Sequence, residues 1–588
     1  LVRAASLADP APWRAADLVL VPSTFLAEAA VAFGIEHARV RIIPSGVDLA
    51  RIPFAVREPD ADGTVTVVFV GRFVPKKGAV DAARALAVVG RDRPFLRALF
   101  VGYGEQAADV ADALAPLLDR ATVVDGTAPG AVAAALSRGH LLISPSRTAI
   151  DGDAETLSVV NLEAQAAGLP VVTTRHGGIP DSVTEDSAVL VGEGDHDGLV
   201  DAVAALIDEP ARWPAMGMAG RRHVSLNFEL SARTAEVEAN YTALVNGTPG
   251  PPPRELRTEW PTVSVVVPTY NRRDLVGQTI GALVAQTYPA DRVEVAVVDD
   301  ASTDDTVEAL TARGASTPWP LRVLRHDENR SAADARNTGL AATSGEVVAF
   351  TDSDCRPDPT WLEALVAGLG SGVDIVQGRT TPDPTQPLEP LSRSQWVPAE
   401  YGLYETCNLA YRREVLDGLA EGPFGSDLAR DVLAVVGDRL GGLGFGEDTE
   451  LAWRAKRTGA VSRFAAGAIV RHEVFAPDPT YLMRRAMLAA CFPLLVRRVP
   501  ELRDAFLWRH WFVGRRRLVV LSAIAGALLT PLDRRAAALV VPWIVTNARP
   551  TRRGWRGRLR ALPVLAGRDL VETGALVVGS VKARQVVL

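Results

Sequence analysis

Residues 345–355 read GEVVAFTDSDC, an apolar run that ends directly in two carboxylates, Asp352 and Asp354. Side chains two positions apart lie on the same side of an extended chain, so both carboxylates can face one divalent cation. The arrangement favours a nucleotide-sugar, whose diphosphate would bind that cation. Asp-x-Asp also occurs in solvated turns, and the neighbouring sequence decides between the two interpretations.

Two apolar runs upstream also end in polar side chains. TVSVVVPTYNR closes on Pro268 and Tyr270, and VEVAVVDDASTDDT passes through Asp300, with a helix-like stretch between them. Strand, helix and strand in this order predict a parallel βαβ sheet. Ligands of such sheets bind beyond the carboxyl ends of the strands, so we expect Tyr270, Asp300 and Asp354 to converge on one pocket.

Another pair of carboxylates lies downstream, in GFGEDTELAWRAKRTG. Glu447 and Asp448 directly precede a helical pattern, which places a carboxylate near the positive N-terminus of a helix. From these residues alone, two interpretations stay open: Asp448 is the helix N-cap, or it belongs to the site.

In its motifs and their spacing, the segment 262–475 resembles a family 2 glycosyltransferase of the GT-A fold. The motifs are, in order, VVVPTYNR, VVDDASTDDT, ARNTGLAATSGEVVAFTDSDC, CNLAYRREVL and GEDTELAWR. The resemblance implies a magnesium or manganese ion and a catalytic base, Asp448. The donor-binding residues that it implies are Pro268, Tyr270, Asp300, Arg336 and Asp352, and the metal ligands are Asp352, Asp354 and His472.

The chemistry of direct displacement agrees with this assignment. A base must take the proton of the acceptor hydroxyl, and a cation must neutralise the charge that develops on the departing diphosphate. No covalent intermediate is needed, so we expect inversion at the anomeric carbon. A partly buried structural histidine is the alternative interpretation of His472.

The first half of the chain carries a second set of motifs. VTVVFVGRFVPKKG and HLLISPS are strand-like runs followed by turns, and Glu155 and Glu163 lie eight residues apart in GDAETLSVVNLEAQAAGLPVVTTRHGGIPDSV. Residues 1–247 thereby resemble the donor-binding lobe of a family 4 glycosyltransferase of the GT-B fold, including its paired glutamates. The resemblance implies that Arg72 and Lys77 bind the diphosphate and that Glu163 binds the ribose.

The predicted organisation is α/β: a Rossmann-like GT-B lobe over residues 1–247, a GT-A domain over 262–475 and a helical basic tail over 476–588. The proline-rich segment TPGPPPRELRTEWP, residues 248–261, is predicted to be an extended linker. A GT-B enzyme closes two lobes around its substrates, and the chain begins in the connection between them. We therefore expect a fragment whose first half binds a nucleotide-sugar but catalyses poorly.

Charge is distributed unevenly along the chain. The whole chain has a formal net charge of -7, yet residues 476–588 contain 20 Lys and Arg against 6 Asp and Glu. The apolar stretches 518–530 and 536–545 are shorter than the ~20 residues of a spanning helix. Helices lying on an anionic membrane fit better, and a helical cap packed on the enzyme is the alternative. The tryptophans expected at the membrane boundary are Trp508, Trp511, Trp543 and Trp555.

The cysteines are few, Cys355, Cys407 and Cys491, and lack metal-ligand spacing. Together with the tail they predict a cytoplasmic protein that is peripheral on the inner face of the membrane. The expected partners are a nucleotide-sugar donor and a glycan or lipid-linked saccharide acceptor, with no nucleic acid because the body is acidic.

Other classes of function fit the sequence less well. An NAD-dependent oxidoreductase lacks support because VGYGEQ falls short of the dinucleotide fingerprint. A processive polysaccharide synthase would carry a Gln-x-x-Arg-Trp element and long membrane spans, and a binding scaffold is plausible for the first half only. We expect transfer of one sugar in cell-surface or exopolysaccharide synthesis. Trp396, Tyr401 and Tyr404 are either an apolar platform for the acceptor sugar or part of the core.

Overall fold

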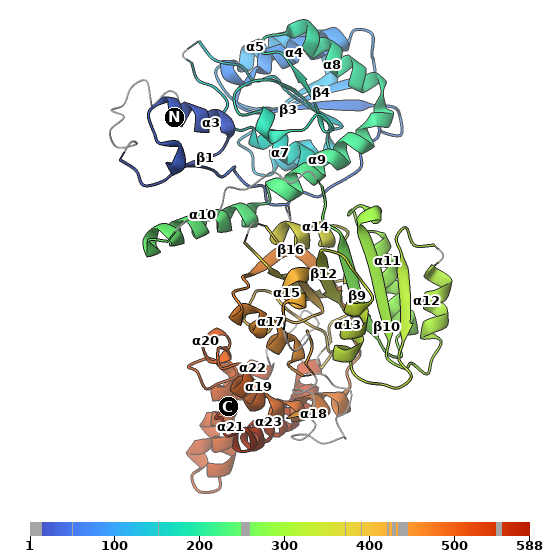
Figure 1. The fold of residues 1–588 in the computed structure, drawn as a ribbon, viewed down its shortest axis with the longest axis vertical. Coiled ribbons are helices and arrows are strands. Elements are labelled where there is room, and N and C mark those ends of the chain that lie inside the picture. The colour runs from blue at the N-terminus through green and yellow to red at the C-terminus, as the bar shows by residue number, and fades with distance from the viewer. Residues whose placement is uncertain are drawn as a thin grey trace. The chain divides into compact units, whose positions relative to one another are not determined.

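The computed structural model of the 588-residue chain describes two compact units, Leu1–Trp260 (unit 1) and Pro261–Leu588 (unit 2) (Figure 1). Most of the predicted linker lies outside the described residues. The described residues are 15–49, 51–150, 152–248, 259–314, 316–370, 372–389, 391–419, 423–425, 431–432, 445–548 and 556–588.

Unit 1 is built on a six-stranded parallel sheet in the order β5-β4-β3-β6-β7-β8. Its strands are nearly continuous apolar runs because helices cover both faces of the sheet. The strand order reverses between β3 and β6, which opens a crevice at their carboxyl ends. The strands are β3 (Val65–Val70), β4 (Leu96–Gly102), β5 (Ala121–Asp125), β6 (Leu141–Ser144), β7 (Val171–Thr174) and β8 (Ala188–Val191).

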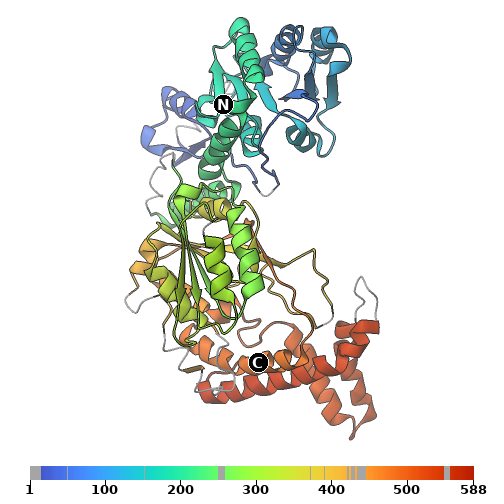
Figure 2. The same ribbon diagram turned by 90° about the vertical axis from the view of Figure 1, so that its right-hand side faces the viewer.

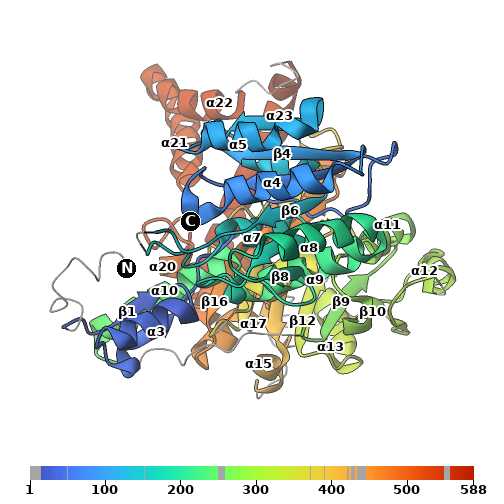
Figure 3. The same cartoon turned by 90° about the horizontal axis from the view of Figure 1, so that it is seen from above.

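The helices of unit 1 form two layers. On one face α4, α5 and α8 pack through a core that contains Phe69, Phe100 and Trp213, and on the other face α6 and α7 pack on Leu142 and Leu169 (Figure 1). Figure 3 shows α4 and α5 side by side over β4. The helices are α3 (Thr24–Ala32), α4 (Ala79–Val89), α5 (Ala107–Leu114), α6 (Ala131–Arg138), α7 (Val159–Ala166), α8 (His196–Asp208), α9 (Trp213–Asn227) and α10 (Leu230–Asn246), and β1 (Val19–Val21) pairs with β2 (Val40–Ile42) beside α3.

Unit 2 contains an eight-stranded mixed sheet in the order β11-β10-β9-β12-β15-β14-β16-β13. The first four strands are parallel, and β15 runs antiparallel to β12, with the residue pair 351 and 408 at the carboxyl end of β12. The start of β15 therefore lies at the same edge as the ends of the parallel strands. The strands are β9 (Val263–Thr269), β10 (Val293–Asp299), β11 (Leu321–Arg325), β12 (Val347–Thr351), β13 (Cys355–Pro357), β14 (Ile375–Pro382), β15 (Asn408–Arg412) and β16 (Ser462–His472).

Helices of residues 273–457 flank this sheet, with α13 packed on β9 and β10 and α14 packed on β16. Further helices follow β16 along the chain. The flanking helices are α11 (Arg273–Val284), α12 (Thr306–Gly314), α13 (Ala332–Ala341), α14 (Trp361–Gly368), α15 (Arg413–Asp417) and α17 (Glu447–Arg457). Those after β16 are α18 (Pro479–Met487), α19 (Phe492–Arg498), α20 (Leu502–Ala505), α21 (Arg516–Leu529), α22 (Val541–Ala548) and α23 (Arg556–Ala583). The α/β prediction is confirmed in both units.

The start of the C-terminal segment packs on the sheet domain. Leu494 and Leu495 share a core with Trp453 of α17 and with the end of α23. Ion pairs join Arg457 to Glu501 at 2.7 Å and Arg498 of α19 to a glutamate of α17 at 2.9 Å. Residues 479–507 thus form a cap on the domain.

The rest of the C-terminal segment stands at one end of α23 (Figure 2). The expected boundary position of Trp543 is wrong, because its side chain is buried and its indole N–H donates to Asp569 at 2.8 Å. Trp511 is 48% exposed, whereas Trp555 lies outside the described residues. Among the residues described, no helix has the length and apolar character needed to cross a bilayer.

Candidate active site

The loops that follow β9 and β10 are tied together at the carboxyl edge of the sheet in unit 2. The backbone N–H of Asn271 donates to Ser302 Oγ at 2.7 Å, and the N–H of Thr303 donates to Asn271 Oδ1 at 2.8 Å. Tyr270 remains 45% exposed at this edge, where its ring can stack on a base. Pro268 is buried within β9, opposite Val298.

Asp300 is buried, and both of its oxygens accept hydrogen bonds from the protein. Oδ1 accepts from His326 Nδ1 at 2.7 Å and from the N–H of Arg330 at 2.9 Å, while Oδ2 accepts from the N–H of Ser331 at 3.0 Å. In this conformation Asp300 fixes the loop between β11 and α13. The structure thus places Asp300 at the predicted edge, as a residue that holds this loop, and Asp300 is not among the residues that line the cavity beside Asp448.

A buried cation, Arg336 of α13, joins the carboxyl end of β12 to the start of α17. Its Nη2 lies 2.9 Å from Asp352 Oδ1, and its Nη1 lies 3.5 Å from Glu447 Oε1. Burial alone would lower the pKa of Arg336, but the charges of these two carboxylates raise it overall. The guanidinium therefore stays charged and holds two chain segments around one cavity.

The sequence-predicted metal ligands are partly brought together. Asp354 Oδ1 lies 3.6 Å from His472 Nε2, since β13 and β16 pair with Cys355 opposite His472. His472 Nδ1 lies 2.8 Å from the backbone oxygen of Glu473, to which it donates, and Nε2 is left as the ligand atom. Asp352 instead faces Arg336.

This donor set fits a hard divalent cation. Within the part of the chain that is described, possible ligand atoms of Asp354, Cys355 and His472 lie within 4.8 Å of one another. Burial raises the pKa of Cys355, which keeps the thiol protonated, and Mg²⁺ and Mn²⁺ prefer oxygen to thiol ligands. Burial also raises the pKa of Asp354, and the charge of the nearby His472 offsets part of this effect.

Asp448 lies in the first turn of α17, whose N-cap is Gly446, so the N-cap interpretation of Asp448 is wrong. Its Oδ1 accepts from the N–H of Thr449 at 2.8 Å. Burial, and then the nearby charges of Glu447 and Glu405, raise the pKa of Asp448 to about 8. A carboxylate with this pKa is a far stronger base than an exposed one.

A cavity of about 310 Å³ brings several of these side chains together, whereas Asp354 is not among the residues that line it. Asp352, His472 and Asp448 line it, together with residues that the sequence analysis did not single out. The latter include Glu405 and Thr406, just before β15, and Arg485, Phe492 and Leu495, from the C-terminal cap. The antiparallel direction of β15 explains the position of Glu405, but an apolar run in a sequence does not show which way its strand runs.

The predicted aromatic platform does not form as a unit. Tyr404 is buried in the core and donates to Glu400 at 2.6 Å, whereas Trp396 is 61% exposed. Tyr401 donates to Glu405 Oε1 at 2.8 Å. Tyr401 thus acts on the cavity through the carboxylate that it holds.

In unit 1 the predicted diphosphate-binding residues follow β3, where the strand order reverses. Gly78 has a φ of +66°, and a Cβ there would lie 2.0 Å from the carbonyl oxygen of Pro145, so the two loops approach closely. Lys77 forms an ion pair with Glu155, and the N–H of Glu155 donates to His176 Nε2 at 3.1 Å. Arg72 is exposed.

Glu163 of α7 lines a separate cavity of about 540 Å³ in unit 1. The rest of its lining is mostly small and apolar, with Gly126 and Gly130 after β5 and Ile52 and Pro53 from the chain before β3. Burial raises the pKa of Glu163. A carboxylate in such surroundings is well placed to accept hydrogen bonds from a hydroxyl-bearing ligand.

Comparison with known protein families assigns both units. The family model Glycosyl transferase family 2 matches residues 264–417, and Glycosyl transferases group 1 matches residues 64–209. The chain combines two glycosyltransferase domains. The two resemblances inferred from the sequence are therefore confirmed, with a Rossmann-like unit followed by a family 2 domain.

Curated relatives of the chain are also glycosyltransferases. Glycosyltransferase AglE of Haloferax volcanii is 43% identical over 120 residues, which are 20% of this chain and 39% of the relative. The GDP-mannose-dependent monoacylated alpha-(1-6)-phosphatidylinositol monomannoside mannosyltransferase of Corynebacterium glutamicum is 32% identical over 207 residues, which are 34% of this chain and 54% of the relative. The chain spans about half the length of the curated relatives it matches.

Among solved structures, the similarities are of low overall score. Mannosyltransferase PcManGT from Pyrobaculum calidifontis, in complex with GDP-Man and Mn²⁺, is 20% identical, with a TM-score of 0.35 over 60% of this chain and 96% of that chain. Sucrose-phosphate synthase from Thermosynechococcus elongatus is 27% identical, with a TM-score of 0.34 over 41% of this chain and 61% of that chain.

Proposed function

We propose that unit 2 transfers a single sugar from a nucleoside diphosphate sugar to a saccharide or lipid-linked saccharide, with inversion at the anomeric carbon. The observation that carries the proposal is the shared cavity of Asp448, Asp352 and His472. It sets a basic carboxylate opposite a cluster suited to a diphosphate-bound cation. This pairing is what a one-step displacement requires.

The chain's own side chains divide the work of the reaction. Asp448 accepts the proton of the attacking hydroxyl, and its raised pKa favours that transfer. Arg336 holds Asp352 and Glu447 in place. Tyr270 stacks on the base, and Asp300 and Pro268 shape the wall beside it. A magnesium or manganese ion, held by Asp352, Asp354 and His472, would neutralise charge on the leaving diphosphate.

For unit 1 we propose binding of a nucleotide-sugar. Arg72 and Lys77 would contact the diphosphate at the crevice between β3 and β6, and Glu163 would accept from the ribose hydroxyls. Glu155 holds Lys77 in place through their ion pair. Two transferase domains in one chain suit consecutive additions to one acceptor, as in the synthesis of a cell-surface polysaccharide.

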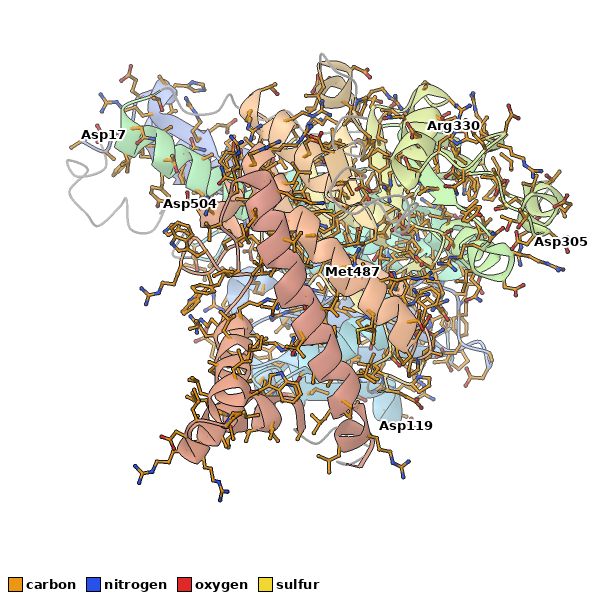
Figure 4. All side chains as sticks on the ribbon, turned by 90° about the horizontal axis from the view of Figure 1, so that it is seen from below. Asp17, Asp119, Asp305, Arg330, Met487 and Asp504 are labelled. Atoms are coloured by element: carbon orange, nitrogen blue, oxygen red, sulfur yellow. The ribbon has the colours of Figure 1, made fainter. Side chains whose placement is uncertain are left out.

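We further propose that the C-terminal segment lies on the anionic inner face of a membrane. Several apolar side chains of α21, α22 and the turn between them are exposed, including Leu528 at 72% and Leu532 at 85%. Two exposed arginines, Arg534 and Arg535, follow Leu532 after an intervening Asp533. Apolar side chains with adjacent arginines match the boundary between acyl chains and anionic headgroups. Figure 4 shows side chains standing out from these helices.

The catalytic proposal is tested on the full chain. UDP-, GDP- and TDP-sugars are screened by thermal shift with and without Mn²⁺, because a ligand of the folded state raises the melting temperature. Asp354→Asn should abolish the Mn²⁺-dependent shift of unit 2, and Glu163→Gln the shift of unit 1. Asp448→Asn should lower turnover, whereas Asp305→Asn, at an exposed surface position, should not. Equal turnover in Asp448→Asn and the unaltered chain would refute the proposal.

The membrane proposal is tested by sedimentation with vesicles. The chain should bind vesicles that contain phosphatidylglycerol more strongly than pure phosphatidylcholine vesicles. Leu528→Ser combined with Leu532→Ser should weaken that binding, while Val245→Ser, an exposed apolar position of unit 1, serves as the control. If both variants bind both kinds of vesicle equally well, the exposed apolar residues of α21, α22 and the turn between them do not contact the membrane.

A further inference from the structure

Glu405 carries a carboxylate oxygen that the fold leaves unused. Its Oε1 accepts from the hydroxyl of Tyr401 at 2.8 Å. Its Oε2 is buried and has no hydrogen-bond partner among the residues that the structure describes. The side chain lines the same cavity as Asp448, and the N–H of the next residue, Thr406, donates to Asp448 Oδ2 at 3.4 Å.

A neighbouring pair shows what a purely structural glutamate looks like in this loop. In both pairs, Glu400 with Tyr404 and Tyr401 with Glu405, a glutamate and a tyrosine lie four residues apart. The order of the two residue types is exchanged between the pairs. Glu400 Oε1 accepts from Tyr404 at 2.6 Å and from Ser462 Oγ at 2.7 Å, and Glu400 does not line the cavity. Leaving a buried carboxylate oxygen unpaired costs free energy, which a ligand hydroxyl in the cavity would recover.

The other walls of the cavity indicate what kind of group enters. Leu403 and Leu495 line it beside Phe445 and Phe492, whose rings meet edge to face with centroids 6.1 Å apart. Apolar side chains suit the C–H face of a sugar ring, and a few placed polar atoms suit its hydroxyls. The cavity is lined by the carboxylates of Asp352, Glu405, Glu447 and Asp448 and by the guanidinium groups of Arg336 and Arg485. An anionic group next to both Glu405 and Asp448 would be repelled by the two carboxylates there.

We propose that Glu405 binds a hydroxyl of a neutral acceptor sugar, next to the hydroxyl whose proton Asp448 takes. The assignment rests on the proposed transfer reaction and names its acceptor as a sugar ring that presents two neighbouring hydroxyls. Tyr401 is a positioning residue, since it holds Oε1 and leaves Oε2 to the acceptor. The cap residues Phe492 and Leu495 form the apolar side of the same subsite.

The test pairs a residue change with a change in the acceptor. The full chain is assayed in the presence of Mn²⁺ and of the nucleotide-sugar that stabilises it in the thermal-shift screen. The acceptors are the methyl glycosides of glucose, mannose, galactose and rhamnose. The best acceptor is then replaced by its single-deoxy analogues. Glu405→Gln keeps the size of the side chain, and Glu405→Asp withdraws the carboxylate by one methylene. Glu400→Gln is the matched control, because Glu400 belongs to the same loop but lies off the cavity.

One deoxy analogue should lower kcat/KM of the unaltered chain at least about tenfold, as expected for a lost hydrogen bond to a charged group. With the parent glycoside, kcat/KM of both Glu405 variants should be lower than that of the unaltered chain by about the same factor. With that deoxy analogue, kcat/KM of the variants should equal that of the unaltered chain. Glu400→Gln should keep the preference of the unaltered chain for the parent glycoside over the deoxy analogue. Such non-additivity marks a direct contact.

Two results would overturn the proposal while leaving the transfer reaction standing. One is an equal loss by the Glu405 variants for the parent and every analogue. The other is donor hydrolysis that depends on Asp448 without transfer to any of the glycosides. Donor hydrolysis that does not respond to Asp448→Asn would instead remove the proposed function itself.

Discussion

Replacing Asp448 by asparagine should make unit 2 more stable and less active. The pKa of Asp448 rises from 3.8 to about 8 in the fold, mainly through burial. A carboxyl whose pKa is raised by folding stabilises least at high pH, since the unfolded state ionises first. The penalty grows by about 1.4 kcal/mol per pH unit between the two pKa values.

The magnitude follows from these values. Ionisation of Asp448 lowers the free energy of unfolding by ~2 kcal/mol at pH 5 and by ~6 kcal/mol at pH 8.5, whereas asparagine does not ionise. Asparagine keeps only one of the two backbone N–H bonds of the carboxylate, which offsets about 1 kcal/mol. We therefore expect Asp448→Asn to gain ~5 kcal/mol at pH 8.5 and little at pH 5.

Calorimetry across pH 5 to 8.5 measures this gain, with the melting of unit 1 as an internal reference. Turnover should fall by roughly 10² to 10⁴ when the base is removed, and that of the unaltered chain should rise with pH up to about 8. A stability difference that does not grow with pH would show that Asp448 ionises normally, and the proposed base would then lose its physical support.

Three further substitutions test other parts of the two units. Arg336→Ala leaves two carboxylates without their buried cation and should destabilise unit 2 by about 3–5 kcal/mol in urea unfolding, with Arg336→Lys intermediate. Gly78→Ala should cost unit 1 more than ~2 kcal/mol because of the close carbonyl, while Gly194→Ala, also at positive φ but in open space, should cost about 1 kcal/mol. His472→Ala should weaken Mn²⁺ binding at least about tenfold by titration calorimetry, and an unchanged affinity would exclude His472 as a ligand.

The sequence supports the parallel part of the site better than the rest. Apolar runs that end in Tyr270, Asp300 and Asp352 predict strand ends, and parallel strands bring those ends to one edge. The position of Glu405 cannot be predicted in this way because Glu405 precedes its strand. Only the antiparallel direction of β15 brings Glu405 to the carboxyl edge of the sheet. The burial of Trp543 depends on a partner, Asp569, that is distant in sequence.

Asp300 shows a second limit of sequence inference. A carboxylate at a strand end predicts a ligand contact, yet here it accepts three hydrogen bonds from the loop between β11 and α13. Hydrogen-bond partners of this kind are set by loop conformation, which periodicity and motif spacing do not determine. The sequence predicts the residue type and its position at the edge of the sheet. It does not predict whether the carboxylate bonds to a neighbouring loop or to a ligand.

The walls of the cavity in unit 2 come from two parts of the chain, which differ in how far a substitution disturbs buried ion pairs. The proposed cation ligands lie on or next to strands of the sheet and the proposed base lies on α17, where Arg336 pairs with Asp352 and Glu447. Phe492 and Leu495 come from the cap, which follows β16 along the chain. A substitution of Phe492 or Leu495 would therefore reshape the cavity without breaking the ion pairs of Arg336.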